Sequence, residues 1–237
     1  MQVYVRLAIV FYMLPILGDR FLSNLIVKNS IIALAIIGLW PCANTTVISE
    51  QGWLVSLMKE GLVGLLLATT ICLPFWIVIG LGEILDNQRG ATISESIDPV
   101  NGAQTSILSS FFNFTFGSIF FASNGMPRLL DVMAQSYQVL PRGSNFAHIH
   151  LDQSGQLLVL LVKNSLLLAA PAMLVMMISE VLLGVFARYC PQLNPFSLSM
   201  TVKSFIAFII FLFYGFHALS EKPLHMFTIS FFQRILS

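Results

Sequence analysis

The residues best able to make specific polar contacts are concentrated in one short stretch, Gly82 to Gly102, with the sequence GEILDNQRGATISESIDPVNG. The 237-residue chain has only 12 Lys and Arg and 11 Asp and Glu, and five of these charged residues lie in this stretch: Glu83, Asp86, Arg89, Glu95 and Asp98. Asp86 comes three residues before Arg89, so a helix would place both side chains on one face. The stretch therefore predicts polar contacts at a helix end.

Patterns typical of catalysis or metal binding are weak in this sequence. It has no HExxH, no GxSxG and no pair of aspartates within an apolar stretch, so we expect no enzyme activity. The run HIHLD, which holds His148, His150 and Asp152, has no further ligand cluster beside it. We therefore predict neither a metal site nor a cofactor.

The composition favours a membrane-type protein over a soluble one. Hydrophobic residues make up 57% of the chain and charged residues 10%, and the mean hydropathy is +0.84. Globular proteins have about 25% charged residues, so lipid or other apolar protein must cover much of this surface. The net charge of +1, without a basic run, disfavours nucleic-acid binding. The three cysteines are odd in number and predict no disulfide framework.

Six apolar stretches predict helices, and the fold class is all-α. Spanning a bilayer takes about 20 apolar helical residues, and one stretch meets this cleanly while the others are short or contain charged and polar residues. We expect four to six membrane-class helices, several of them poor spanners and several broken by proline, with the first one a helix rather than a cleaved signal. The stretches are Val3–Leu17, Ile31–Ala43, Gly61–Gly82, Ile107–Ser123, Leu157–Ile178 and Ser204–Ser220. Leu182–Phe186 and Met226–Phe232 are candidates for half-helices or amphipathic pieces.

The charged stretch itself belongs outside lipid. Each Asp, Lys or Arg at a bilayer centre costs about 2.5–3.5 kcal/mol and each Leu or Ile returns about 0.5 kcal/mol, so the charges prevail. EILDNQRG is expected to extend the preceding helix by two turns, with Gly90 as its C-terminal stop. Asp98-Pro99 and Asn101-Gly102 predict a turn.

A stripe of small and polar residues follows the turn at helical spacing. Ser106, Ser109 or Ser110, Asn113 and Gly117 would share one helix face. Small residues allow helices to approach closely, and Ser or Asn can form hydrogen bonds across them. The stripe indicates either helix–helix packing or the lining of a conduit.

Several motifs resemble the SctT family of type III secretion systems, the injectisome relatives of the flagellar FliR proteins. LGEILDNQRGAT followed by IDPVNG carries the resemblance most strongly, and the DNQRGAT form is more similar to the injectisome branch. The remaining motifs follow in the family's order along nearly the whole chain: Arg6, Pro15, Lys28, GLWP ending at Pro41, PFW at Pro74–Trp76, SYQVLP at Ser136–Pro141 and SEVLLGVFARYCPQLNPFSLSMTVKS at Ser179–Ser204. Family members usually have a longer segment before the equivalent of Arg6.

The resemblance implies a structural and gating subunit of an export gate. SctR-like and SctS-like subunits would join it to form the pore through which unfolded proteins leave across the bacterial inner membrane, with an SctU-like subunit as a further partner. The family's fold implies tilted, proline-broken helical hairpins packed into a helical assembly that projects toward the periplasm. It further implies one domain over residues 1–237, with an SctR-like portion at about 1–156 and an SctS-like hairpin at about 157–219. Lys163, Glu180 and Lys203 fit helices that face protein.

The resemblance also assigns roles to two groups of residues. It implies a loop that closes the pore, at Ile93, Ser94, Ile97, Asp98, Pro99, Val100, Asn101 and Gly102. The expected contacts with neighbouring subunits are at Glu83, Asp86, Asn87, Gln88, Arg89, Gln192, Asn194 and Lys203. A small-solute secondary transporter is the alternative function, because broken helices and buried charges suit one.

Overall fold

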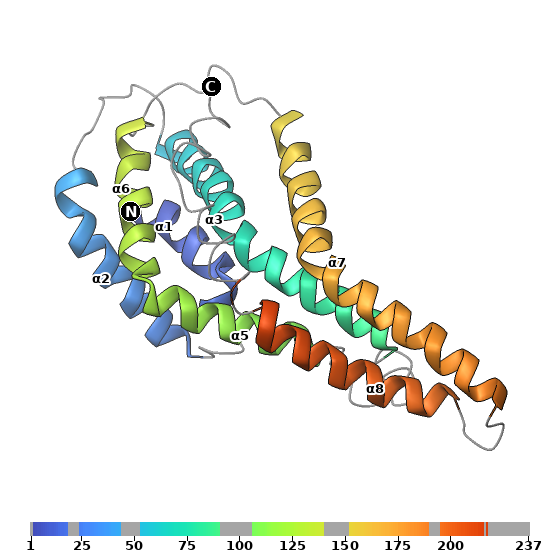
Figure 1. Ribbon diagram of the computed structural model, residues 1–237. Coiled ribbons are helices and arrows are strands. Elements are labelled where there is room, and N and C mark those ends of the chain that lie inside the picture. Colours follow the sequence, from blue (N-terminus) through green and yellow to red (C-terminus); the bar gives the residue numbers. More distant parts are fainter. Residues whose placement is uncertain are drawn as a thin grey trace. The chain divides into compact units, whose positions relative to one another are not determined.

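The computed structural model describes residues 2–18, 24–43, 53–90, 106–139, 152–189, 195–215 and 217, and every element in these ranges is helical (Figure 1). The prediction of an all-α protein is confirmed for these residues. The elements, in chain order, are α1 Gln2–Met13, a 3-10 turn Pro15–Leu17, α2 Leu25–Ala43, α3 Trp53–Arg89, α5 Ile107–Ala122, α6 Gly125–Val139, α7 Asp152–Tyr189, α8 Pro195–Ile210 and a π-helical turn Phe211–Gly215.

Local sequence explains where several helices begin and end. The α1 helix ends before Pro15, which has no backbone N–H to continue it and instead opens the 3-10 turn. The Asn24 side chain accepts a hydrogen bond from the Ile26 amide at 3.0 Å and so caps α2. The α3 helix stops at Gly90, whose φ of 79° is the left-handed conformation that glycine tolerates best. The predicted two-turn extension and glycine stop are therefore confirmed.

Internal prolines bend helices here rather than end them. Pro74 lies inside α3 and Pro171 inside α7. Figure 1 shows α7 bending along its length, as a missing backbone donor would cause. The α7 helix also runs through Leu182–Phe186, so the expectation of a separate half-helix there is wrong.

The contacts divide the chain into two compact units. Unit 1 comprises Met1–Trp76, Gly117–Val159 and Pro223–Ser237, and unit 2 comprises Ile77–Phe116 and Leu160–Lys222. In unit 1, α1 packs on α2 and α2 on α6, and the rings of Phe75 and Phe120 meet edge to face at 5.4 Å. The division into SctR-like and SctS-like portions stays a prediction.

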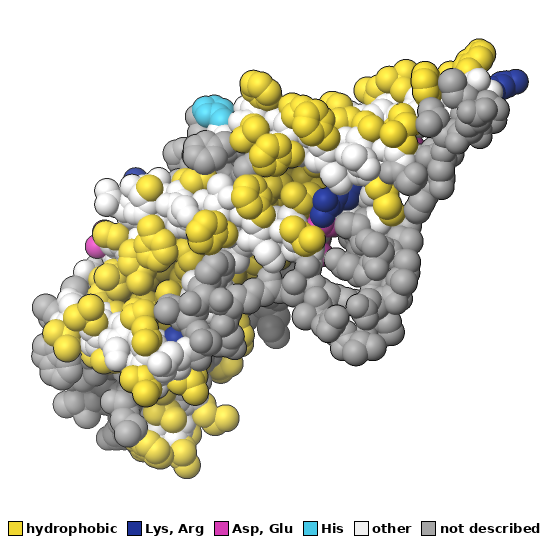
Figure 2. Space-filling view, turned by 90° about the horizontal axis from the view of Figure 1, so that it is seen from below, with side chains coloured by type: hydrophobic (Ala, Val, Ile, Leu, Met, Phe, Trp, Pro, Cys, Tyr) yellow, Lys and Arg dark blue, Asp and Glu magenta, His cyan; other side chains and the backbone are white. Residues whose placement is uncertain are grey.

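Two helices are long and apolar enough to cross a membrane: α3 and the Val159–Tyr189 part of α7. The other apolar helices among the described residues are shorter, in line with the expected poor spanners. Hydrophobic side chains dominate the face shown in Figure 2, and charged ones are few. A surface of this kind requires an apolar environment.

Candidate functional site: a polar cluster at the end of α3

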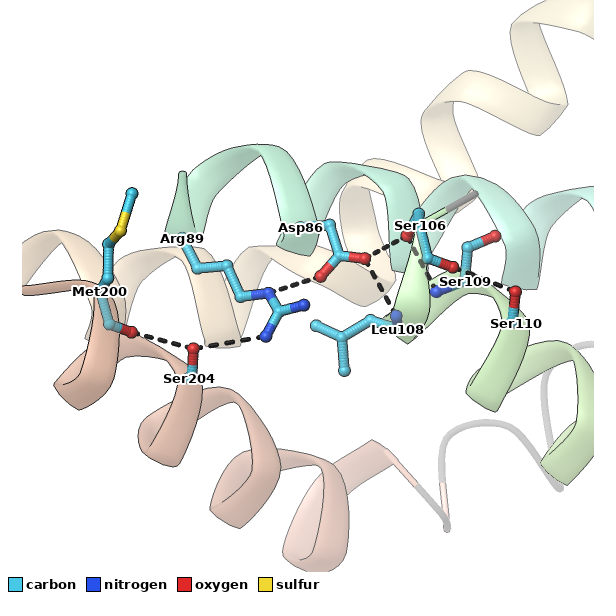
Figure 3. A network of polar contacts seen from close by, with 8 residues as sticks. All are labelled: Asp86, Arg89, Ser106, Leu108, Ser109, Ser110, Met200 and Ser204. Carbon is cyan, nitrogen blue, oxygen red and sulfur yellow. Dashed lines mark hydrogen bonds and ion pairs between the residues drawn. The ribbon is translucent and has the colours of Figure 1, made fainter. Parts of the chain in front are cut away.

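Asp86 lies at the centre of a polar cluster in unit 2 and is only 2% exposed. Its Oδ1 accepts a hydrogen bond from Nε of Arg89 at 2.5 Å, which confirms the predicted pairing on one helix face. Its Oδ2 accepts hydrogen bonds from the Ser106 hydroxyl and from the Leu108 amide, the latter at 2.9 Å (Figure 3). Hydrogen bonds from three donors therefore offset the free-energy cost of burying the Asp86 carboxylate.

The same carboxylate caps the next helix. Ser106 immediately precedes α5, and its Oγ accepts a hydrogen bond from the Ser109 amide at 3.0 Å, as an N-cap residue does. Asp86 accepts the Leu108 amide of the same first turn and places a negative charge at the positive end of the α5 dipole. The end of α3 thus supplies a hydrogen-bond acceptor for a backbone amide in the first turn of α5.

Gly82 allows the two helices to approach closely at this point. A Cβ atom at Gly82 would lie 2.3 Å from Cα of Ser109 and 2.5 Å from its backbone nitrogen. Any other residue at position 82 would force the backbones of α3 and α5 apart. Ser109 and Asn113 of α5 are buried as well, so the small-residue stripe serves helix packing in this unit.

The cluster extends to α7 and α8. Arg89 donates from Nη1 to Oγ of Ser204 at 3.3 Å. Lys203 donates from Nζ to the Gln88 carbonyl at 3.3 Å and forms a 2.9 Å ion pair with Glu180 of α7. A cation at the last carbonyls of α3 is also favoured by the helix dipole. The end of α3 therefore contacts both α5 and α8, and α8 in turn pairs with α7.

Unit 1 contains a second buried ionic group that the sequence did not predict. Arg6 is 1% exposed and donates from Nε to Glu60 at 2.8 Å and from Nη1 to the carbonyl and hydroxyl oxygens of Ser136 at 3.4 Å. Its guanidinium also lies 4.3 Å from the ring centroid of Tyr137. The available signal was Arg6, the one charge of an apolar helix, and Glu60, which follows Lys59 at the start of a long apolar run.

The structure brings four of the predicted contact residues together: Asp86, Gln88, Arg89 and Lys203. Glu83 and Asn87 lie on the exposed side of α3. Gln192 and Asn194 lie outside the described residues, as do all of the predicted pore-closing residues: Ile93, Ser94, Ile97, Asp98, Pro99, Val100, Asn101 and Gly102. In the described ranges, no group of three His, Cys, Asp or Glu side chains is arranged to hold a metal ion.

The chain is similar to known export proteins over nearly its whole length. Residues 1–221 match the family described as "Bacterial export proteins, family 1". The chain is 41% identical over 214 residues to the Surface presentation of antigens protein SpaR of Shigella flexneri, covering 89% of this chain and 82% of the relative. It is 30% identical over 221 residues to the Yop proteins translocation protein T of Yersinia pestis, covering 89% of this chain and 83% of the relative.

A flagellar protein is a more distant relative. The chain is 26% identical over 200 residues to the Flagellar biosynthetic protein FliR of Pectobacterium carotovorum, covering 81% of this chain and 75% of the relative. These matches confirm the resemblance that the motifs indicated.

Proposed function

The chain belongs to the family of bacterial export proteins, family 1, and from this premise we propose that it is a structural and gating subunit of a type III secretion export gate. With SctR-like and SctS-like subunits it forms the pore through which unfolded proteins are exported. The observation that carries this proposal is the family match over residues 1–221, supported by the named secretion relatives. None of the relatives named above is described as a small-solute transporter.

The environment and partners follow from the same proposal. The subunit resides in the bacterial inner membrane, and the assembled gate projects toward the periplasm. An SctU-like subunit is a further partner, the exported chains pass through in transit, and lipid covers part of the apolar surface. The chain contributes structure rather than catalysis, and nucleic acid plays no part.

The polar cluster at the end of α3 has a positioning role in this proposal. Asp86 and Arg89 join the end of α3 to the start of α5 and to the middle of α8. Lys203 of α8 also contacts the end of α3 and pairs with Glu180 of α7. A fixed helix end presents its exposed side chains, Glu83 and Asn87, in one geometry to a neighbouring subunit. We assign the other predicted intersubunit contacts, Gln192 and Asn194, to the same kind of interface.

The experiment that tests the function is complementation. A strain that lacks the gene is expected to retain its secreted proteins inside the cell, and the wild-type chain on a plasmid restores their export. Immunoblots of culture supernatant and cells measure the two pools. Normal secretion in the deletion strain, with the other apparatus subunits present, would overturn the proposal.

The predicted pore-closing segment has a separate test. Deletion of Ser94–Gly102 is expected to raise the ion leak of the purified assembled gate in liposomes, because an apolar constriction excludes hydrated ions. Replacing the same residues by an equally long Gly-Ser segment separates the effect of sequence from that of length. An intact assembly with unchanged leak would show that these residues do not close the pore.

A further inference from the structure

The α7 helix exposes a long apolar face in unit 2. Large hydrophobic side chains along it are about half exposed, among them Leu167, Leu174, Met177 and Val181. The opposite side, with Ser165, Ala169, Ala172 and Met176, is buried in the chain. The exposed face is therefore a surface that the described residues leave uncovered.

One row of residues on this face follows the pattern of a helix-packing seam. Their spacing alternates four and three residues, the 3.5-residue period with which one helix packs along another. Ala170 and Gly184 occupy two of the positions, and a Cβ at Gly184 would meet nothing within 4 Å. Small residues at such positions leave room for a close partner helix. We define this α7 seam as Lys163, Leu167, Ala170, Leu174, Met177, Val181 and Gly184.

Lys163 is the one charged residue of the α7 seam, and it is exposed. Within the described part of the chain no acidic side chain pairs with it, whereas Lys203, at the other end of this face, pairs with Glu180. A single Lys in an otherwise apolar seam fixes the register of a partner when a carboxylate lies opposite. The charge thus specifies the chemistry of whatever covers this face.

Lipid alone fits this face poorly. The uncharged run between Lys163 and Glu180 is sixteen residues, which span about 24 Å of helix. The hydrocarbon core of a bilayer is about 30 Å thick. A membrane centred on this run would hold Lys163 and Glu180 just inside the two edges of its core, so lipid alone does not match the length of the uncharged run.

We infer that the α7 seam docks an apolar helix of another subunit, and that a carboxylate on that helix pairs with Lys163. The inference rests on the proposed function, which supplies the neighbouring subunits, and it adds the surface and the charge that recognise one of them. The partner helix presents small or apolar residues at the same 3.5-residue spacing, with one acid at the end opposite Lys163.

Two substitutions in the complex test this inference. The tagged chain is co-expressed with the SctR-like and SctS-like subunits, and the co-purified amount of each is measured by quantitative mass spectrometry. Lys163→Glu is expected to lower the yield of one subunit about tenfold, because like charges then face each other. Lys163→Gln lowers the yield less. Arg128→Glu, a charge reversal at an exposed position of α6, is the matched control and leaves the yield unchanged.

A photoreactive amino acid identifies what lies on the seam. At Leu174 it is expected to crosslink to the subunit lost from Lys163→Glu, and at Phe186, exposed but outside the α7 seam, to give less of that adduct. Replacing the crosslinked helix's acid by lysine restores the yield of Lys163→Glu.

The outcomes separate the inference from the function on which it rests. If the wild-type chain forms the complex and the Lys163→Glu chain forms it equally well, the inference alone is overturned. A crosslink from Leu174 to lipid or to a second copy of this chain overturns it as well. A wild-type chain that co-purifies with no subunit overturns both. The Lys163→Glu chain alone must match the wild type in helical content and in its elution profile in detergent. If it is misfolded, the co-purified yields of the Lys163→Gln and Leu174→Asp variants test the inference instead: a lowered yield of one subunit supports it, and unchanged yields overturn it.

Discussion

Asp86 combines two stabilising roles in a single buried side chain. It pairs with Arg89 on its own helix and caps α5 through Ser106 and Leu108. Arg89 then reaches Ser204 of α8. Loss of the carboxylate leaves a guanidinium, a hydroxyl and an amide without their acceptor, so the cost exceeds that of one ordinary hydrogen bond.

Asp86→Ala is therefore expected to lower the free energy of unfolding by about 3 kcal/mol, from the broken ion pair and the lost cap. Asp86→Asn keeps an acceptor for the amide and is expected to cost less, about 1–2 kcal/mol. Denaturant unfolding in detergent, followed by circular dichroism, measures both. Glu83→Gln, at an exposed position one turn earlier, is the control, with an expected change within about 0.5 kcal/mol. Equal stability of Asp86→Ala and wild type would refute the capping role.

Arg6 and Glu60 make a second residue-scale prediction. Glu60→Gln leaves the Arg6 charge buried without its counter-ion and is expected to cost about 3–5 kcal/mol. The double variant Arg6→Met, Glu60→Leu removes both charges and is expected to lose less stability than Arg6→Met or Glu60→Leu alone. A double-mutant cycle by the same unfolding assay gives the coupling. Additive single effects would mean that the two side chains are not coupled.

The two ionic groups differ in how far the sequence could predict them. Asp86 and Arg89 are three residues apart, so helical periodicity alone placed them on one face. Arg6 and Glu60 are separated by 54 positions and meet only because α1 packs near the first turns of α3. Such a pairing depends on tertiary packing, which no local pattern encodes.

Close backbone contact sets the geometry at the scale of elements. The α3 and α5 helices touch where Gly82 faces Ser109, next to the cap that Asp86 provides. The Gly82–Ser109 contact keeps the start of α5 close enough for Asp86 to cap it. The cap in turn keeps the two backbones in contact.

Gly82→Ala is expected to destabilise the protein by about 2 kcal/mol, because the added methyl meets backbone atoms that can only move apart. Gly38→Ala in α2 is a matched control: its Cβ would meet nothing within 4 Å, so the higher helix propensity of alanine is expected to stabilise by about 0.5–1 kcal/mol. Unfolding midpoints of the two variants should therefore move in opposite directions. A stabilising Gly82→Ala would contradict the close approach.

Helix ends were predictable where a residue with a definite backbone preference marks them. Gly90 and Pro15 did so. The sequence patterns underestimated the lengths of α3 and α7. Charged residues such as Lys59 and Glu60 end an apolar stretch, and a proline suggests that the helix breaks. Buried pairing keeps Glu60 inside the helix, and Pro171 bends α7 without ending it.

At the scale of the whole molecule, the described residues leave a large apolar surface uncovered. Only 28% of the most apolar window of α7 is buried by the chain itself, against 67% for α3. Composition predicted such a surface and the motif series predicted the family, but neither could locate the face, because it depends on which side of α7 packs inward. A chain of this kind is expected to be stable only in an assembly or in lipid.

The central claim, membership of a multi-subunit export gate, is tested most directly by the mass of the complex that the chain forms. The tagged chain, co-expressed with its SctR-like and SctS-like candidates and extracted in mild detergent, is analysed by native mass spectrometry. We expect one complex whose mass requires this chain together with copies of both other subunits. A chain that elutes alone and transports a small solute in liposomes would contradict it.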